Sequence, residues 1–168
     1  MIEYEYSFKV ESLEPYIKYC EEQGYEKVSF ESQVRELFTS TNNILARITT
    51  KNTSGVVKTF LDFKDDDDSD EILKCSRETI PLEVTAENRK SINSILDILN
   101  YKKIKHLDRK RVIYKKGNVV FEIDNYSSPE VMYVVAIEGE KEAVDKVYKD
   151  ISKRVNEWYF KVSVLNMK

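Results

Sequence analysis

Strict alternation of apolar and polar side chains is the feature that most constrains the fold of this chain. Between residues 2 and 10 the even positions carry Ile, Tyr, Tyr, Phe and Val, while the odd positions carry Glu, Glu, Ser and Lys. Successive side chains of a β-strand point to opposite faces of a sheet. The alternation therefore predicts a strand with one buried face and one polar face.

Seven further segments have strand character, at residues 27–38, 44–50, 57–64, 72–80, 106–114, 118–124 and 131–138. The sequence from Lys115 to Asn118 contains a glycine and is typical of a hairpin turn between two of these strands. Eight alternating strands can close into a barrel, and a small barrel can hold one ligand.

Three other segments show the spacing of amphipathic helices. The first follows a predicted N-cap at Ser12 and ends at Gly24, and the second follows a predicted N-cap at Thr85. The third spans about residues 140–160, with Trp158 as a docking anchor on its apolar face. These helices are interspersed with the strands.

The chain is predicted to form one α+β domain over residues 1–168, because no linker rich in Gly, Pro or Ser divides it. An acidic run at residues 65–70 is predicted to be a solvated loop. It lacks the spaced glycine and the distal glutamate of a calcium-binding loop.

Composition excludes several classes of protein. The 27 Lys and Arg against 30 Asp and Glu leave a net charge of −3, too small for a general binder of nucleic acid or membrane surfaces. We expect no transmembrane helix and no secretory signal, and two cysteines without CxxC spacing indicate a reducing, cytoplasmic location. One histidine, His106, and four glycines argue against a zinc site, a serine or cysteine triad and a P-loop.

The polar faces of the predicted strands are sorted by charge. Acidic residues group at Glu3 with Glu5, at Glu122 with Asp124, and at Glu138, whereas basic residues are Arg47, Lys58, Lys64, Arg77, Arg109 and Arg111. Carboxylates without histidine suit Mg²⁺ or Mn²⁺, and guanidinium and ammonium groups suit phosphate oxygens. Together they predict a site for a metal-bound polyphosphate, although each charge taken alone is more typical of the solvated face of a sheet.

The order of short motifs resembles that of the CYTH superfamily, also called the triphosphate tunnel metalloenzymes. Residues 3–10 resemble its ExExK opening strand. Further resemblances follow in the family's order at Gln33–Phe38, Arg47, Lys64, Arg77–Glu78, Arg109–Tyr114, Phe121–Asp124 and Ala136–Gly139. The family includes class IV adenylate cyclases, thiamine-triphosphatases and inorganic triphosphatases.

The resemblance implies an eight-stranded antiparallel tunnel with about three helices outside and a triphosphate inside. It implies catalytic roles for Glu3, Glu5 and Lys9. It implies Mg²⁺ or Mn²⁺ ligands at Glu3, Glu5, Glu122, Asp124 and Glu138, and phosphate contacts at Arg47, Lys64, Arg77, Arg109 and Arg111. The reaction would be hydrolysis of a nucleoside, thiamine or inorganic triphosphate, or cyclisation of ATP.

The chain departs from the family pattern at several positions. Ser7 stands where the opening lysine is expected, with Lys9 one strand period further on, and Ala136 replaces the first glutamate of the final ExE strand. Arg35 replaces an aspartate, and Arg47 stands alone where two arginines are usual. The alternatives to a divergent enzyme are therefore a weakened tunnel that binds or sequesters a phosphorylated ligand, and a barrel used as an interaction scaffold. We expect a small triphosphate partner and neither nucleic acid nor membrane; the oligomeric state, including a homodimer, is left open.

Overall fold

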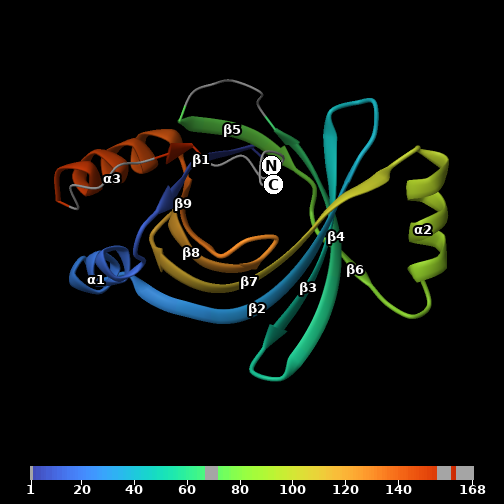
Figure 1. Ribbon diagram of the computed structural model, residues 1–168. Helices are drawn as coiled ribbons and strands as arrows, with labels where there is room; N and C mark the ends of the chain where they lie inside the picture. The colour runs from blue at the N-terminus through green and yellow to red at the C-terminus, as the bar shows by residue number, and fades with distance from the viewer. Residues whose placement is uncertain (1, 67–71, 155–159, 162–168) are drawn as a thin grey trace.

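A closed antiparallel barrel of eight strands forms the centre of the computed structural model, which describes residues 2–66, 72–154 and 160–161 (Figure 1). The wall consists of β1 (Ile2–Val10), β2 (Glu26–Thr39), β3 (Ile44–Thr53), β4 (Val56–Asp66), β5 (Leu73–Glu78), β7 (Lys102–Lys116), β8 (Val119–Ser128) and β9 (Met132–Gly139). Its order is β1-β5-β4-β3-β2-β7-β8-β9, and β9 pairs again with β1. The predicted α+β fold with an eight-stranded antiparallel tunnel is confirmed.

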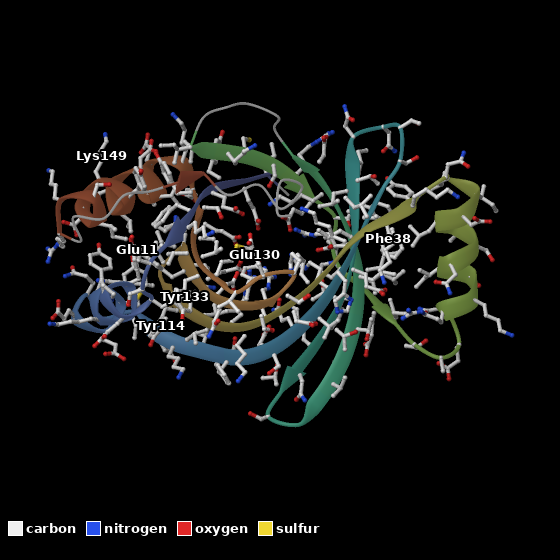
Figure 2. All side chains as sticks on the ribbon, in the orientation of Figure 1. Glu11, Phe38, Tyr114, Glu130, Tyr133 and Lys149 are labelled. Carbon is white, nitrogen blue, oxygen red and sulfur yellow. The ribbon has the colours of Figure 1, made fainter. Side chains whose placement is uncertain are left out.

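The described part of the chain has three helices, α1 (Glu14–Glu22), α2 (Arg89–Ile98) and α3 (Lys141–Arg154). Helices α1 and α3 lie on one side of the barrel and α2 on the other (Figure 1). Outward side chains of the wall, such as Phe8 and Ile137, share one buried cluster with Tyr16 of α1 and Val144 of α3. Tyr114 belongs to the same cluster and lies beside α1 in Figure 2.

Helix α2 covers a second, smaller apolar area of the outer wall. Its Ile92 and Leu96 are buried against Ala46 and Ile48 of β3, and Phe38 lies on this side of the barrel in Figure 2. Because the apolar faces of these strands are covered from outside, their polar faces line the interior of the barrel.

Part of the barrel interior is filled by a third cluster of buried apolar side chains, which we call the apolar floor. Its members are Leu37, Leu45, Leu107, Tyr126, Met132 and Val134. Leu37 pairs with Arg47 across β2 and β3, and Leu45 pairs with Lys64 across β3 and β4. Residues paired directly across neighbouring strands share a face, so the floor adjoins charged inner side chains.

The observed strands differ from the prediction in number and in length; for example, β7 begins four residues before, and β8 ends four residues after, the predicted bounds. The β-strands β6 (Leu82–Val84), paired with β4, and β10 (Phe160–Lys161), paired with β1, were not predicted. Asp65 and Asp66 continue β4 instead of opening the expected loop, because they pair with Arg77 and Ser76 of β5. The rest of the acidic run lies outside the described residues.

The helix ends differ as well. Helix α1 is capped at Leu13 with Pro15 in its first turn, while Ser12 Oγ accepts a hydrogen bond from the Glu14 amide at 3.3 Å. Helix α2 is capped at Asn88, whose Oδ1 accepts a bond from the Thr85 amide at 2.8 Å, so the predicted cap at Thr85 is wrong.

The third helix was predicted to reach residue 160, but Phe160 is a strand residue. Trp158 lies outside the described residues. The turn before β8 is confirmed, with Gly117 at φ +59°. In the part of the chain that is described, no helix combines the length and the apolar character needed to span a membrane.

Candidate functional site

The interior of the barrel contains a cavity of about 240 Å³. Each of the eight wall strands contributes at least one charged side chain to its lining. The lining arises from the period of two, which turns alternate residues of each strand inward. The cavity is therefore a charged chamber inside an apolar outer shell.

Strand register places particular charges beside one another. Glu5 pairs with Glu138 across β1 and β9, and Arg111 pairs with Asp124 across β7 and β8. Residues that pair directly lie about 4.5–5.5 Å apart at their Cβ atoms, so these side chains interact. The pairing of β1 with β9 thus brings two carboxylates together, and the pairing of β7 with β8 brings a cation to a carboxylate.

The arginine wall, as we call the inner faces of β2, β3 and β7, is organised around Asp124. Arg111 donates to Asp124 from Nε at 2.7 Å and from Nη2 at 2.8 Å, and Arg109 donates from Nη1 at 3.2 Å. Asp124 is 1% exposed. Burial would raise the pKa of Asp124, but Arg109 and Arg111 outweigh it and hold the pKa below its usual value. Arg111 also forms an ion pair with Glu122.

Arg47 is held in a similar way on the neighbouring strands. It donates to Asp62 from Nε at 2.8 Å and from Nη2 at 2.6 Å, and to Glu78 from Nη2 at 2.8 Å. Lys64 lies 3.4 Å from both Glu78 and Glu5. Burial would raise the pKa of Glu78, but Arg47 and Lys64 lower it overall. This network links the arginine wall to the carboxylates of β1.

The acidic corner is formed by Glu3 and Glu5 of β1, Glu122 of β8 and Glu138 of β9. Burial, followed by the charges of Glu122 and Glu5, raises the pKa of Glu138 well above its usual value. Burial would also raise the pKa of Glu5, but Lys64 and a hydrogen bond with Glu138 keep it lowered. The pKa of Glu138 is therefore raised while the pKa of its neighbour Glu5 is lowered.

Two guanidinium groups in the cavity, those of Arg35 and Arg109, have N–H donors with no acceptor among the described residues. Arg35 donates from Nε to Thr49 Oγ1 at 2.9 Å, and no carboxylate among the described residues pairs with it. Burial and the charges of Arg109, Arg47 and Arg111 lower the pKa of Arg35. Arg109 donates from Nε to Gln33 and from Nη1 to Tyr126, but within the described residues nothing accepts from its buried Nη2.

The donor chemistry of the acidic corner fits a hard divalent cation. Across the described residues no three acidic, cysteine or histidine side chains are close enough to form a ready-made metal cage. Mg²⁺, however, is usually held by one or two carboxylates together with water and substrate phosphates. Glu5 and Glu138, with Glu122 nearby, meet that smaller requirement, and a cation would relieve the repulsion that contributes to the raised pKa of Glu138.

Most of the residues predicted for the site line this cavity. They are Glu5, Arg47, Lys64, Arg109, Arg111, Glu122, Asp124 and Glu138. Glu3 is not part of the lining but lies close to it: it is half-buried, and its pKa is raised by burial and by the charges of Glu78 and Glu122. The structure brings these side chains together, while their individual roles stay predictions.

Two predicted site residues lie away from the cavity. Lys9 is exposed near the end of β1 and is not part of the lining. The side chain of Arg77 is 71% exposed and pairs with Asp65 at 2.6 Å on the outside of the barrel. Its neighbour Glu78 faces inward because it pairs with Lys64 across β5 and β4.

The prediction did not include several charged residues of the lining, namely Arg35, Lys51, Asp62, Lys74 and Glu78. Some had a signal in the sequence. Asp62 lies two residues before Lys64, and Lys74 lies four residues before Glu78, so each pair shares a strand face. Ser7 and Ala136, the two departures from the family pattern, also line the cavity.

No protein-family model and no curated protein matches the chain. Solved structures, however, share its fold. The PH1012 protein of Pyrococcus horikoshii OT3 is 20% identical over 98% of both chains, with a TM-score of 0.75. HpAC1 from Hippeastrum, a candidate adenylyl cyclase described as having a dominant triphosphatase activity, is 13% identical over 96% of this chain and 91% of its own, with a TM-score of 0.69.

A candidate adenylate cyclase from Vibrio parahaemolyticus is 11% identical over 98% of this chain and 95% of its own, with a TM-score of 0.63. At these identities the likeness establishes the fold. The class defined here is thus a closed eight-stranded barrel with a charged interior, and proteins with this fold include candidate adenylate cyclases and a triphosphatase.

Proposed function

We propose that the chain is a divalent-metal-dependent protein that processes a triphosphate inside its barrel. One observation carries the proposal: a single cavity is lined both by carboxylates of the acidic corner, Glu5, Glu122 and Glu138, and by the arginines of the arginine wall. A triphosphate with its cation needs both kinds of group, one for the metal and one for the phosphate oxygens.

The roles follow from the positions of the side chains. Glu5, Glu138 and Glu122, with Glu3 beside them, would hold Mg²⁺ or Mn²⁺. Asp124 has its oxygens engaged by arginines, so its proposed part is to orient Arg109 and Arg111. When bound, the cation would neutralise phosphate charge and activate water.

Arg47, Arg109 and Arg111 would bind phosphate oxygens and stabilise the charge that develops during transfer. Lys64 lies between the acidic corner and the arginine wall and would bridge them to the same phosphate chain. The reaction is hydrolysis of a nucleoside, thiamine or inorganic triphosphate, or cyclisation of ATP; the similar folds of HpAC1 and of the candidate adenylate cyclase support this class.

A second candidate function is binding of a phosphorylated ligand with little turnover. Ser7 and Ala136 favour it, because they line the cavity without supplying a charge. A missing metal ligand or misplaced substrate can reduce the rate by orders of magnitude while binding persists.

The test measures phosphate and pyrophosphate release from ATP, thiamine triphosphate and tripolyphosphate, with Mg²⁺, Mn²⁺ or EDTA. We expect metal-dependent turnover of at least one substrate, and loss of it in Glu5→Ala and Glu138→Ala. Glu130→Ala, which removes an exposed carboxylate in the β8–β9 turn, is the matched control.

Absence of turnover with every substrate and metal would reject the enzymatic function. The binding function then predicts that a triphosphate raises the melting temperature by mass action and is recovered intact. If no ligand raised the melting temperature, that function would be rejected as well.

A further inference from the structure

Not every arginine that lines the cavity is paired with a carboxylate of the barrel wall among the described residues. Arg111 and Arg47 are each engaged by two carboxylates, whereas Arg35 has a hydroxyl as its recorded partner. Arg35 is half-buried, and its nearest charged neighbours include Arg109, Arg47 and Arg111. A guanidinium group among like charges, with no carboxylate paired to it in the described part of the chain, is available to bind an anion.

A second, independent observation points to the same place. Arg109 is 5% exposed, its Nε and Nη1 are engaged, and its Nη2 has no acceptor within the described residues. Both arginines line the cavity, and the charge of Arg109 is the strongest of those that act on Arg35. Two guanidinium groups with free donors close together form a strong receptor for an oxyanion.

The apolar floor adjoins Arg35 and Arg109. Arg35 pairs with Leu107 across β2 and β7, and Leu37 follows it on the same strand face. Both leucines belong to the floor and have no exposed surface. Tyr126, also of the floor, accepts the hydrogen bond from Arg109 Nη1 at 2.7 Å. The pair thus borders the apolar floor, whose buried side chains offer no polar partner for a phosphate chain that would continue in that direction.

We propose that Arg35 and Nη2 of Arg109 form an anion subsite above the apolar floor that receives the uncapped terminal phosphate of a short polyphosphate chain. The inference rests on the proposed function and names its ligand class. The cavity of about 240 Å³ is smaller than the roughly 300–1,000 Å³ typical of pockets for drug-sized ligands. It accommodates a phosphate chain, while a nucleoside at the other end of that chain would remain outside.

The experiment measures binding of tripolyphosphate by calorimetry in EDTA, so that the arginine subsite is tested without metal. Wild-type protein should bind it, and Arg35→Gln should weaken binding at least tenfold. Arg35→Lys should fall between them, because it keeps the charge and loses the planar fork. Arg89→Gln, which removes an exposed guanidinium at the start of α2, is the matched control and should bind as wild type does.

A dinucleoside tetraphosphate, whose phosphate chain is capped at both ends, is the second probe. It should bind at least tenfold more weakly than tripolyphosphate to wild-type protein, and Arg35→Gln should not change its affinity. The melting temperature of Arg35→Gln should equal or exceed that of wild type, because the substitution removes repulsion among four arginines. That result separates lost binding from lost folding.

The inference is overturned if wild type fails to bind tripolyphosphate in EDTA, if Arg35→Gln binds it within twofold of wild type, or if the capped probe binds equally well. Metal-dependent turnover that is indifferent to Arg35 would reject the subsite and leave the proposed function standing. Arg35-dependent binding without turnover would support the subsite and reject the enzymatic function.

Discussion

The acidic corner and the arginine wall face the same cavity but balance their charges in opposite ways. In the acidic corner Glu5 and Glu138 lie side by side, and burial with repulsion raises the pKa of Glu138. On the arginine wall Asp124 is saturated by Arg109 and Arg111, while Arg35 has no paired carboxylate in the part of the chain that the structure describes. One region has an excess of negative groups and the other an excess of positive groups.

Strand register thus places the surplus carboxylates and the surplus arginines in different parts of the cavity, where they do not fully neutralise one another. Two cations reach the acidic corner: Lys64 lies 3.4 Å from Glu5, and Arg111 forms an ion pair with Glu122. Buried like charges persist in a fold when a ligand relieves them or when their perturbed protonation serves chemistry. A cation for one region and an oxyanion for the other would relieve both.

The largest expected effect comes from breaking the saturated part of the arginine wall. Asp124→Ala leaves two buried guanidinium groups without their shared acceptor, and we expect it to lower the free energy of unfolding by about 3–5 kcal/mol. Urea denaturation measures this change. Asp124→Asn, which retains one acceptor oxygen, should cost less; an Ala variant as stable as wild type would show that these ion pairs do not hold the wall together.

Glu78 tests the link between the two regions and should give an intermediate effect. Glu78→Gln weakens the charged contacts with Arg47 and Lys64, which predicts a loss of about 1.5–3 kcal/mol at neutral pH. The folded pKa of Glu78 is lowered from 4.5, so its stabilisation is present above 4.5 and lost as the pH falls through the folded pKa. Stability measured from pH 7 to pH 2 should therefore fall less steeply for Glu78→Gln than for wild type.

The acidic corner should respond in the opposite direction. Glu138→Gln keeps the shape and hydrogen-bonding capacity of the protonated acid and cannot ionise beside Glu5 and Glu122. We expect its metal-free stability to equal that of wild type or exceed it by up to about 1 kcal/mol. Thermal unfolding in EDTA measures it. A loss as large as that of Asp124→Ala would mean that the corner is as well balanced as the arginine wall.

The smallest effect is expected outside the barrel. Arg77 donates to Asp65 at 2.6 Å, as Arg47 does to Asp62, but the Arg77 side chain is 71% exposed and that of Arg47 is 8% exposed. Exposed ion pairs are screened by water and salt and add little stability. Arg77→Gln should leave the melting temperature unchanged within error, while Arg47→Gln should lower it clearly. Equal shifts of the melting temperature in both variants would show that burial does not determine how much each ion pair stabilises the fold.

Much of the fold could be read from local pattern. The period of two in residues 2–10 placed Glu3 and Glu5 on one face, and all eight wall strands were predicted. The helix caps were harder, because Ser12 and Thr85 have capping side chains but the helices begin two or more residues later. The short strand β6 carries too few residues to show a period.

The sequence by itself determined the alternation, and with it an apolar outer face and a polar inner face for most of the wall. It could not determine the face of Arg77 and Glu78, since both are charged and a shift of one residue in register exchanges their directions. The tertiary structure decided this through the pairing of Glu78 with Lys64. It also decided which inner side chains meet, so that Arg109 and Arg111 of β7 bind Asp124 of β8, whereas Arg35 of β2 has no carboxylate partner among the described residues. These contacts depend on how the strands pair, which no pattern within a single strand records.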